Sequence, residues 1–124
     1  MKDKTLNKLT HKFSKLIKSL GNVKGGVIIS KDSFIKIGEV KDEDLEVISR
    51  HIAVVMGSSE MLYRRFKDEV EYIEIKGKKY KTILFNLGKY ICAIVGDVNP
   101  EEIKEEIINI GKSSIEELIE EVAF

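Results

Sequence analysis

The tripeptide Gly111-Lys112-Ser113 is the strongest candidate for chemistry in this sequence, because it is similar to the end of a phosphate-binding loop. Such a loop needs another glycine five residues before the first glycine of the tripeptide, since its backbone N–H groups surround the phosphates. That position holds Glu106, and the segment lies within a helical pattern, whereas the motif requires a junction between a strand and a helix. We therefore reject a nucleotide-hydrolysis site in this segment.

The two histidines and the single cysteine do not suggest a metal or redox site. His11 and His51 fall on different predicted helices, and no Cys-His or His-carboxylate spacing typical of a metal site is present. Cys92 is a lone cysteine, which excludes an internal disulfide, and its place inside an apolar run indicates a buried side chain in a reducing compartment. We expect no metal and no cofactor.

Nucleophiles and paired carboxylates give no catalytic pattern either. The serines stand outside the sharp strand-to-helix turn that exposes a nucleophilic serine. The glutamate pairs 101–102 and 116–117 fall on a solvated helix face, which does not indicate a cleft. We therefore expect a protein that is not an enzyme.

Composition predicts one cytoplasmic domain spanning residues 1–124. Lys plus Arg (21) balances Asp plus Glu (21), so the chain lacks the overall positive field of sequence-blind nucleic-acid binding. No continuous apolar stretch indicates a membrane span. Residues 1–20 are nevertheless rich in lysine and residues 98–124 in glutamate. We expect the two segments to lie together, and a basic RNA- or membrane-binding arm remains the alternative.

Hydrophobic periodicity predicts the order helix, two strands, helix, three strands, helix. The first helix carries a stripe of apolar residues and stops at Gly21. Asp42 is the expected N-cap of the middle helix. The last helix begins at Asn99-Pro100, and Gly111 is a candidate break in it. The predicted ranges are 27–30 and 34–40 for the first two strands, 42–66 for the middle helix, and 70–76, 80–87 and 90–96 for the last three strands.

Side-chain patterns also indicate which strands are central. The strand 90–96 is apolar on both faces, so it is expected to have packing on both sides. The first strand is central by the same reasoning. The strand 70–76 carries three charges, and 34–40 contains Lys36 and Gly38, so both are predicted edges.

The middle helix carries two apolar stripes where a surface helix needs one. The first is expected to face the sheet and consists of Leu45, Ile48, Ile52, Val55, Leu62 and Phe66. The second follows four-three spacing, as in a coiled coil, and we call it the seam; it consists of Val47, His51, Val54, Ser58, Met61 and Arg65. We interpret the seam as the interface of a homodimer, with burial under the domain's own loops as the alternative.

Two further hypotheses concern this helix. Arg50, Arg64 and Arg65 are candidates for docking an acidic partner, although charge compensation at a helix C-terminus explains the last two equally. Because His51 lies on the seam, dimerisation is predicted to depend on pH.

Short motifs along nearly the whole chain, from about residue 5 to 122, resemble those of the roadblock/dynein light-chain superfamily. They are carried by residues 24–32 (Lys-Gly-Gly-Val-Ile-Ile-Ser-Lys-Asp), the acidic start 42–44, the strand and turn 73–78, Leu87-Gly88-Lys89, and Asn109-Ile110-Gly111. Each motif is short, and their order carries the resemblance.

The resemblance implies an α+β fold of the roadblock or profilin-like type, an α/β/α sandwich with a five-stranded antiparallel sheet in the order 2-1-5-4-3. It places the first and last helices on one face and the middle helix on the other. It also implies a homodimer formed by the middle helix and the third strand, which adds Tyr72 and Ile73 to the predicted interface. The implied partner is a small Ras-like GTPase or a related signalling or motility complex. A ligand-sensing module with a pocket between sheet and helix remains the alternative function.

Overall fold

The computed structural model describes residues 2–32 and 34–110, and it shows the α+β architecture that the sequence predicts. The five strands form one antiparallel sheet in the order β2-β1-β5-β4-β3, which confirms the expected topology. The elements are α1 (Lys2–Ser19), β1 (Val23–Ser30), β2 (Lys36–Val40), α2 (Leu45–Arg65), β3 (Tyr72–Lys76), β4 (Lys81–Asn86), β5 (Tyr90–Gly96) and α3 (Pro100–Ile110).

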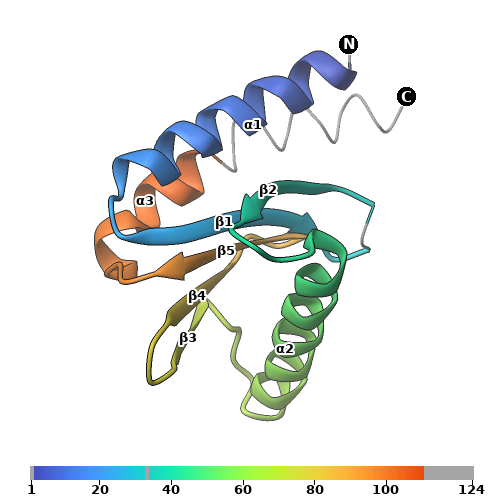
Figure 1. Cartoon of the computed structure of the whole chain (residues 1–124). Coiled ribbons are helices and arrows are strands. Elements are labelled where there is room, and N and C mark those ends of the chain that lie inside the picture. The colour runs from blue at the N-terminus through green and yellow to red at the C-terminus, as the bar shows by residue number, and fades with distance from the viewer. Residues whose placement is uncertain (1, 33, 111–124) are drawn as a thin grey trace.

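Helices cover both faces of the sheet. Figure 1 shows α1 and α3 on one face and α2 on the other. On the first face, Leu9 and Phe13 of α1 share a core with Ile103 and Ile107 of α3. On the second face the side chains of α2 pack against the alternate residues of the central strands. The expected distribution of the three helices is therefore confirmed.

The two central strands, β1 and β5, are paired along most of their length, with Val27 opposite Ala93. Almost every residue of β5 is buried, as its apolar composition predicts. Cys92 is completely buried there, and this burial raises the pKa of its thiol far above the ordinary value. The thiol is therefore not an available nucleophile.

The strand boundaries differ from the prediction around the first hairpin. β1 begins at Val23, earlier than expected, and β2 begins at Lys36, later than expected. Between the two strands, backbone N–H groups are hydrogen-bonded to side chains: the Phe34 N–H donates to Asp32 Oδ1 and the Ile35 N–H donates to Ser30 Oγ. Residues 34 and 35 therefore belong to the turn.

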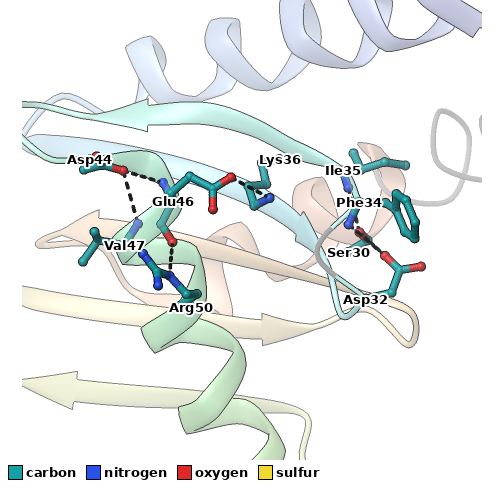
Figure 2. Close-up of polar contacts among 9 residues, drawn as sticks. All are labelled: Ser30, Asp32, Phe34, Ile35, Lys36, Asp44, Glu46, Val47 and Arg50. Atoms are coloured by element: carbon teal, nitrogen blue, oxygen red, sulfur yellow. Dashed lines mark hydrogen bonds and ion pairs between the residues drawn. The ribbon is translucent and has the colours of Figure 1, made fainter.

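Asp44, and not Asp42, is the N-cap of α2, so the prediction was wrong by two residues. The Asp44 carboxylate accepts hydrogen bonds from the backbone N–H groups of Glu46 at 2.8 Å and Val47 at 3.3 Å (Figure 2). Asp42 instead has a positive φ of 65°, which places it in the turn before the helix.

The buried face of α2 is rotated relative to the predicted stripe. Ser49, Ile52 and Met56 are buried, whereas Leu62 and Phe66 are 50% and 63% exposed. Figure 1 shows the C-terminal end of α2 farther from the sheet than its N-terminal end, and residues 61–66 are all exposed. The predicted core role of Leu62 and Phe66 was therefore wrong.

The start of α3 follows the predicted capping pattern. The Glu101 N–H donates to Asn99 Oδ1 at 3.0 Å, and Pro100 is the first helical residue. Lys104 pairs with Glu71, which joins α3 to the segment before β3. The predicted break at Gly111 lies outside the described residues.

A glycine allows α1 to lie directly on the sheet. A Cβ atom added to Gly26 of β1 would lie 2.7 Å from Ile17 Cδ1 and 2.9 Å from Phe13 Cζ. These distances are shorter than van der Waals contact, so a side chain at position 26 would displace the ends of the Ile17 and Phe13 side chains.

Candidate interaction surface

The α2 seam is exposed to solvent in the single chain. Val54 and Met61 are 68% and 66% exposed, Val47 is 43% exposed, and His51 is also exposed. Among the described residues, therefore, no loop of the same domain buries these seam residues, as the alternative would require. Large apolar side chains in a row at these exposures indicate an interaction surface.

Small residues lie beside the apolar side chains of the seam. Ser58 is exposed, and a Cβ atom added to Gly57 would have no heavy atom within 4 Å. Neither residue fills space within its own subunit. The surface between Val54 and Met61 is consequently low enough for a second helix to approach closely.

The structure places Tyr72 and Ile73 on opposite faces of β3, because successive residues of a strand point to opposite sides. Ile73 packs on the α2 side of the sheet. The Tyr72 ring lies 6.0 Å from that of Phe85, and its hydroxyl donates to Glu101 Oε1 at 3.1 Å, which raises the pKa of Tyr72. Of the two residues predicted to add to the interface from β3, only Ile73 lies on the face of the sheet that α2 covers.

The three arginines do not form one cluster. Arg64 and Arg65 are exposed in the last turn of α2, beside the edge-to-face pair of Tyr63 and Phe66, whose ring centroids are 5.5 Å apart. Arg50 lies about 21 Å away along the helix axis, given a rise of about 1.5 Å per residue. Its Nε donates to the Glu46 carbonyl (Figure 2). Docking by these arginines stays a prediction.

A polar network that sequence reasoning missed holds α2 to the sheet. Lys31 Nζ donates to Glu60 Oε2 at 3.1 Å and to Asn86 Oδ1 at 2.9 Å. Asn86 Nδ2 donates to the Val70 carbonyl at 2.9 Å. The network joins residues from four separate segments, so no local pattern indicated it. It fixes the orientation in which α2 presents its outer side.

Asp32 organises the turn between β1 and β2 (Figure 2). Its carboxylate accepts hydrogen bonds from Ser30 Oγ at 2.6 Å and from the Phe34 N–H at 3.1 Å. These two bonds lower the pKa of Asp32 below its ordinary value of 3.8. Phe34 itself is 88% exposed.

This arrangement predicts a pH-dependent effect of the substitution Asp32→Ala. A lowered pKa in the folded state means that the carboxylate stabilises the fold above its unfolded pKa and loses this effect as pH falls through the folded pKa. We expect Asp32→Ala to lower the Tm by a constant amount above about pH 5, and the difference from the parent protein to shrink below pH 3.8. Thermal unfolding followed by circular dichroism measures both; a difference that persists at about pH 2 would contradict it.

An open groove of about 950 Å³ lies beside α1, along β1 and β2. Its walls include Phe13 and Ile17 together with the charged side chains of Lys18, Glu39 and Asp42. This is the feature nearest to the predicted ligand pocket between sheet and helix. Within residues 2–32 and 34–110, no three metal-ligating side chains converge in this groove or elsewhere. In the same part of the chain, no helix is both long and apolar enough to cross a membrane.

Comparison with known proteins gives consistent matches. Residues 9–97 match the Roadblock/LC7 domain. The uncharacterized protein MJ1389 of Methanocaldococcus jannaschii is 52% identical over 128 residues, covering 98% of this chain and 96% of that protein.

Solved structures share the fold at low sequence identity. The Roadblock/LC7 domain from Streptomyces avermitilis superposes with a TM-score of 0.74 at 15% identity, covering 87% of this chain and 95% of that one. Myxococcus xanthus MglB superposes with a TM-score of 0.75 at 12% identity, covering 92% and 96% of the two chains.

Proposed function

We propose, from the premise that this chain belongs to the Roadblock/LC7 domain family, that it is a non-enzymatic homodimer. In this proposal the dimer binds and modulates a small Ras-like GTPase or a related signalling complex. The observation that most directly supports this proposal is the exposure of the α2 seam. Val54 and Met61 expose about two-thirds of their surface, at 68% and 66%, in the middle of the longest described helix. Family membership supports a regulatory role, and the seam supports self-association.

The geometry of the seam favours a symmetric pair. Val47, Val54 and Met61 follow each other at seven-residue intervals on one line of α2. A two-fold axis across this line would bring each apolar side chain onto the same surface of the second subunit. The exposed space at Gly57 would accept side chains of the partner helix. Two copies of α2 would then form the centre of the dimer.

The edge strand supports the same assembly. β3 is the last strand of the sheet, so its outer backbone groups have no neighbouring strand within the described residues. Its residue Ile75 is 44% exposed. A dimer built on α2 and β3 would cover both features at once, while Arg64, which does not belong to the seam, would remain near the end of α2 for a third protein.

Modulation of a GTPase would act through the partner's own catalytic residues. The described residues contain three arginines, all on α2, and Arg50 contacts the backbone of its own helix. A dimer of this kind would order the switch regions of the GTPase, and these regions position the attacking water and the magnesium ion.

Affinity capture tests the proposed partner. We expect the immobilised protein to retain a small GTPase from native lysate, and to retain different amounts with GDP and with a non-hydrolysable GTP analogue. The Arg64→Glu variant, which leaves the seam unchanged, should retain less of it. Recovery of no GTPase with either nucleotide, combined with a bound small molecule found by native mass spectrometry, would reject the proposal.

The ligand-sensing function is a second candidate, and the groove beside α1 favours it. A volume of about 950 Å³ lies within the range that holds small molecules. The groove is open, however, and Phe13 and Ile17 lie directly on Gly26. A ligand would therefore bind beside α1 and not beneath it, and a co-purifying small molecule that raises the Tm would support this function.

A further inference from the structure

We propose that a lysine-rich groove at one end of the sheet binds an extended acidic segment of a partner protein. The groove has a volume of about 600 Å³ and lies in one subunit, away from the α2 seam. It is lined by the loop after α1, the β3–β4 turn and the end of β5. One acidic residue, Asp97, lines the groove. Its five lysines are Lys24, Lys76, Lys78, Lys79 and Lys81.

Most of this positive charge is not neutralised. Lys81 pairs with Glu74 at 3.0 Å. For the other four lysines, no carboxylate lies within ion-pair distance among the described residues. The whole chain has equal numbers of basic and acidic residues, so a surplus of this size at one place is a local feature. It attracts an anionic ligand over a distance of about a Debye length.

The lysines are also arranged at a cost to the fold. The register of the β3–β4 hairpin places Lys76 directly opposite Lys81. Like charges at directly opposed positions destabilise a sheet. The ion pair of Lys81 with Glu74 relieves part of this repulsion, so the stability of the hairpin does not account for the other four lysines, whereas binding of an anionic ligand would.

Tyr80 holds two of the ammonium groups in place without neutralising them. Lys24 Nζ lies 4.8 Å and Lys79 Nζ 5.3 Å from the centroid of the Tyr80 ring. Both distances are within the range of cation–π attraction. These contacts join two segments that are far apart in the sequence. Tyr80 is therefore a positioning residue, because it orients the lysines and leaves their charge available for a ligand.

The surroundings of the groove favour a narrow ligand over a broad anionic surface. The neighbouring groove beside α1 shares Lys24 and carries the acidic side chains of Glu39, Asp42 and Glu43. The groove on the other side shares Lys81 and carries those of Glu74, Asp97, Glu101 and Glu102. A flat anionic membrane would meet these carboxylates as well as the lysines, whereas an extended peptide follows the basic strip between them.

The side-chain types favour carboxylates over nucleic acid. Single-stranded nucleic acid is typically bound by several aromatic side chains on which the bases stack. The groove offers only Tyr80, whose ring already interacts with Lys24 and Lys79. No arginine lines the groove, so the planar, bidentate recognition typical of phosphate groups is absent from it. Lysine ammonium groups suit the side chains of glutamate and aspartate in a flexible segment.

Fluorescence anisotropy with a labelled oligoglutamate peptide tests this site on the full-length protein. We expect saturable binding at about 0.1 M salt. The Lys78→Glu/Lys79→Glu double variant should bind about tenfold more weakly, since each reversal removes one attraction and adds one repulsion. The control is Lys89→Glu in the β4–β5 turn at the opposite end of the sheet, which should bind almost as the parent does.

Variants of Tyr80 test whether binding needs the ring to position the lysines or needs only the charge of the lysines. Tyr80→Leu should weaken binding several-fold although all five lysines remain, and Tyr80→Phe should restore it because the ring is kept. Circular dichroism confirms that each variant is folded. Absence of saturable binding, or equal weakening by Lys89→Glu, overturns the proposal. So does tighter, lysine-dependent binding to phosphatidylserine vesicles or to oligothymidylate, since the ligand is then a membrane or a nucleic acid.

Discussion

Val54→Glu is expected to convert the protein from a dimer into a monomer. Val54 is the most exposed apolar side chain of the α2 seam, at 68%, and a two-fold axis through the seam would bury two copies of it close together. Burying two carboxylates at the centre of an interface without partners costs several kcal/mol. We expect the dissociation constant to rise by at least about 100-fold, which corresponds to about 3 kcal/mol.

Light scattering at several protein concentrations measures the mass of the parent and of the variant. The matched control is Phe34→Glu, which also replaces an exposed apolar residue by glutamate but lies in the β1–β2 turn, outside α2. The control is expected to remain a dimer. If the parent is itself a monomer, or if Val54→Glu remains a dimer, the proposed assembly is wrong. The proposal for the lysine-rich groove does not depend on this result.

Gly38→Ala is expected to destabilise the fold by several kcal/mol, on the order of the strain and overlap costs at this position. Gly38 has a φ of 102°, where a side chain is strained, and its Cβ would lie 2.2 Å from the Gly26 carbonyl oxygen. The obstructing atom is backbone in the neighbouring central strand, so it cannot rotate away. Strain at such a φ costs about 1–3 kcal/mol, and the steric overlap adds a similar amount.

Gly57→Ala is the matched control, since it adds the same methyl group at a helical position with no heavy atom within 4 Å. Helix propensity predicts that it stabilises a single subunit by up to about 1 kcal/mol. Urea unfolding of both variants measures the two effects. A Gly38→Ala variant as stable as the parent would contradict the strain at this position. The Gly57→Ala variant also reports on the dimer, because a methyl group there would obstruct a closely packed partner helix.

Sequence patterns predicted the sheet well because the relevant signals are local. The strand 90–96 was identified with its observed boundaries because it is a continuous apolar run between two turn residues. The cap of α2 was misplaced because Asp42 and Asp44 are both suitable residues. Only the positive φ of Asp42 and the hydrogen bonds of Asp44 distinguish them.

The interaction surfaces were predicted less completely, since they depend on how elements cross. Periodicity found the α2 seam, but it assigned Leu62 and Phe66 to the core because it cannot show where a helix leaves its sheet. The resemblance named Tyr72 and Ile73 together, although the pleat of β3 separates their side chains. The contact of Lys24 with Tyr80 depends on two distant segments meeting at one end of the sheet, and no pattern within either segment indicates it.

The pairing of β1 with β5 has a consequence for how the chain folds. Val27 lies opposite Ala93, so the centre of the sheet joins an early segment to one of the last strands to be synthesised. Contacts between distant residues require closure of a long loop, which slows folding. While the chain is still on the ribosome, the β1–β2 hairpin and α2 can form locally, but the inner edge of β1 has no partner strand until β5 emerges. The nascent protein therefore exposes an unpaired strand edge, which is prone to aggregation, until β5 is synthesised.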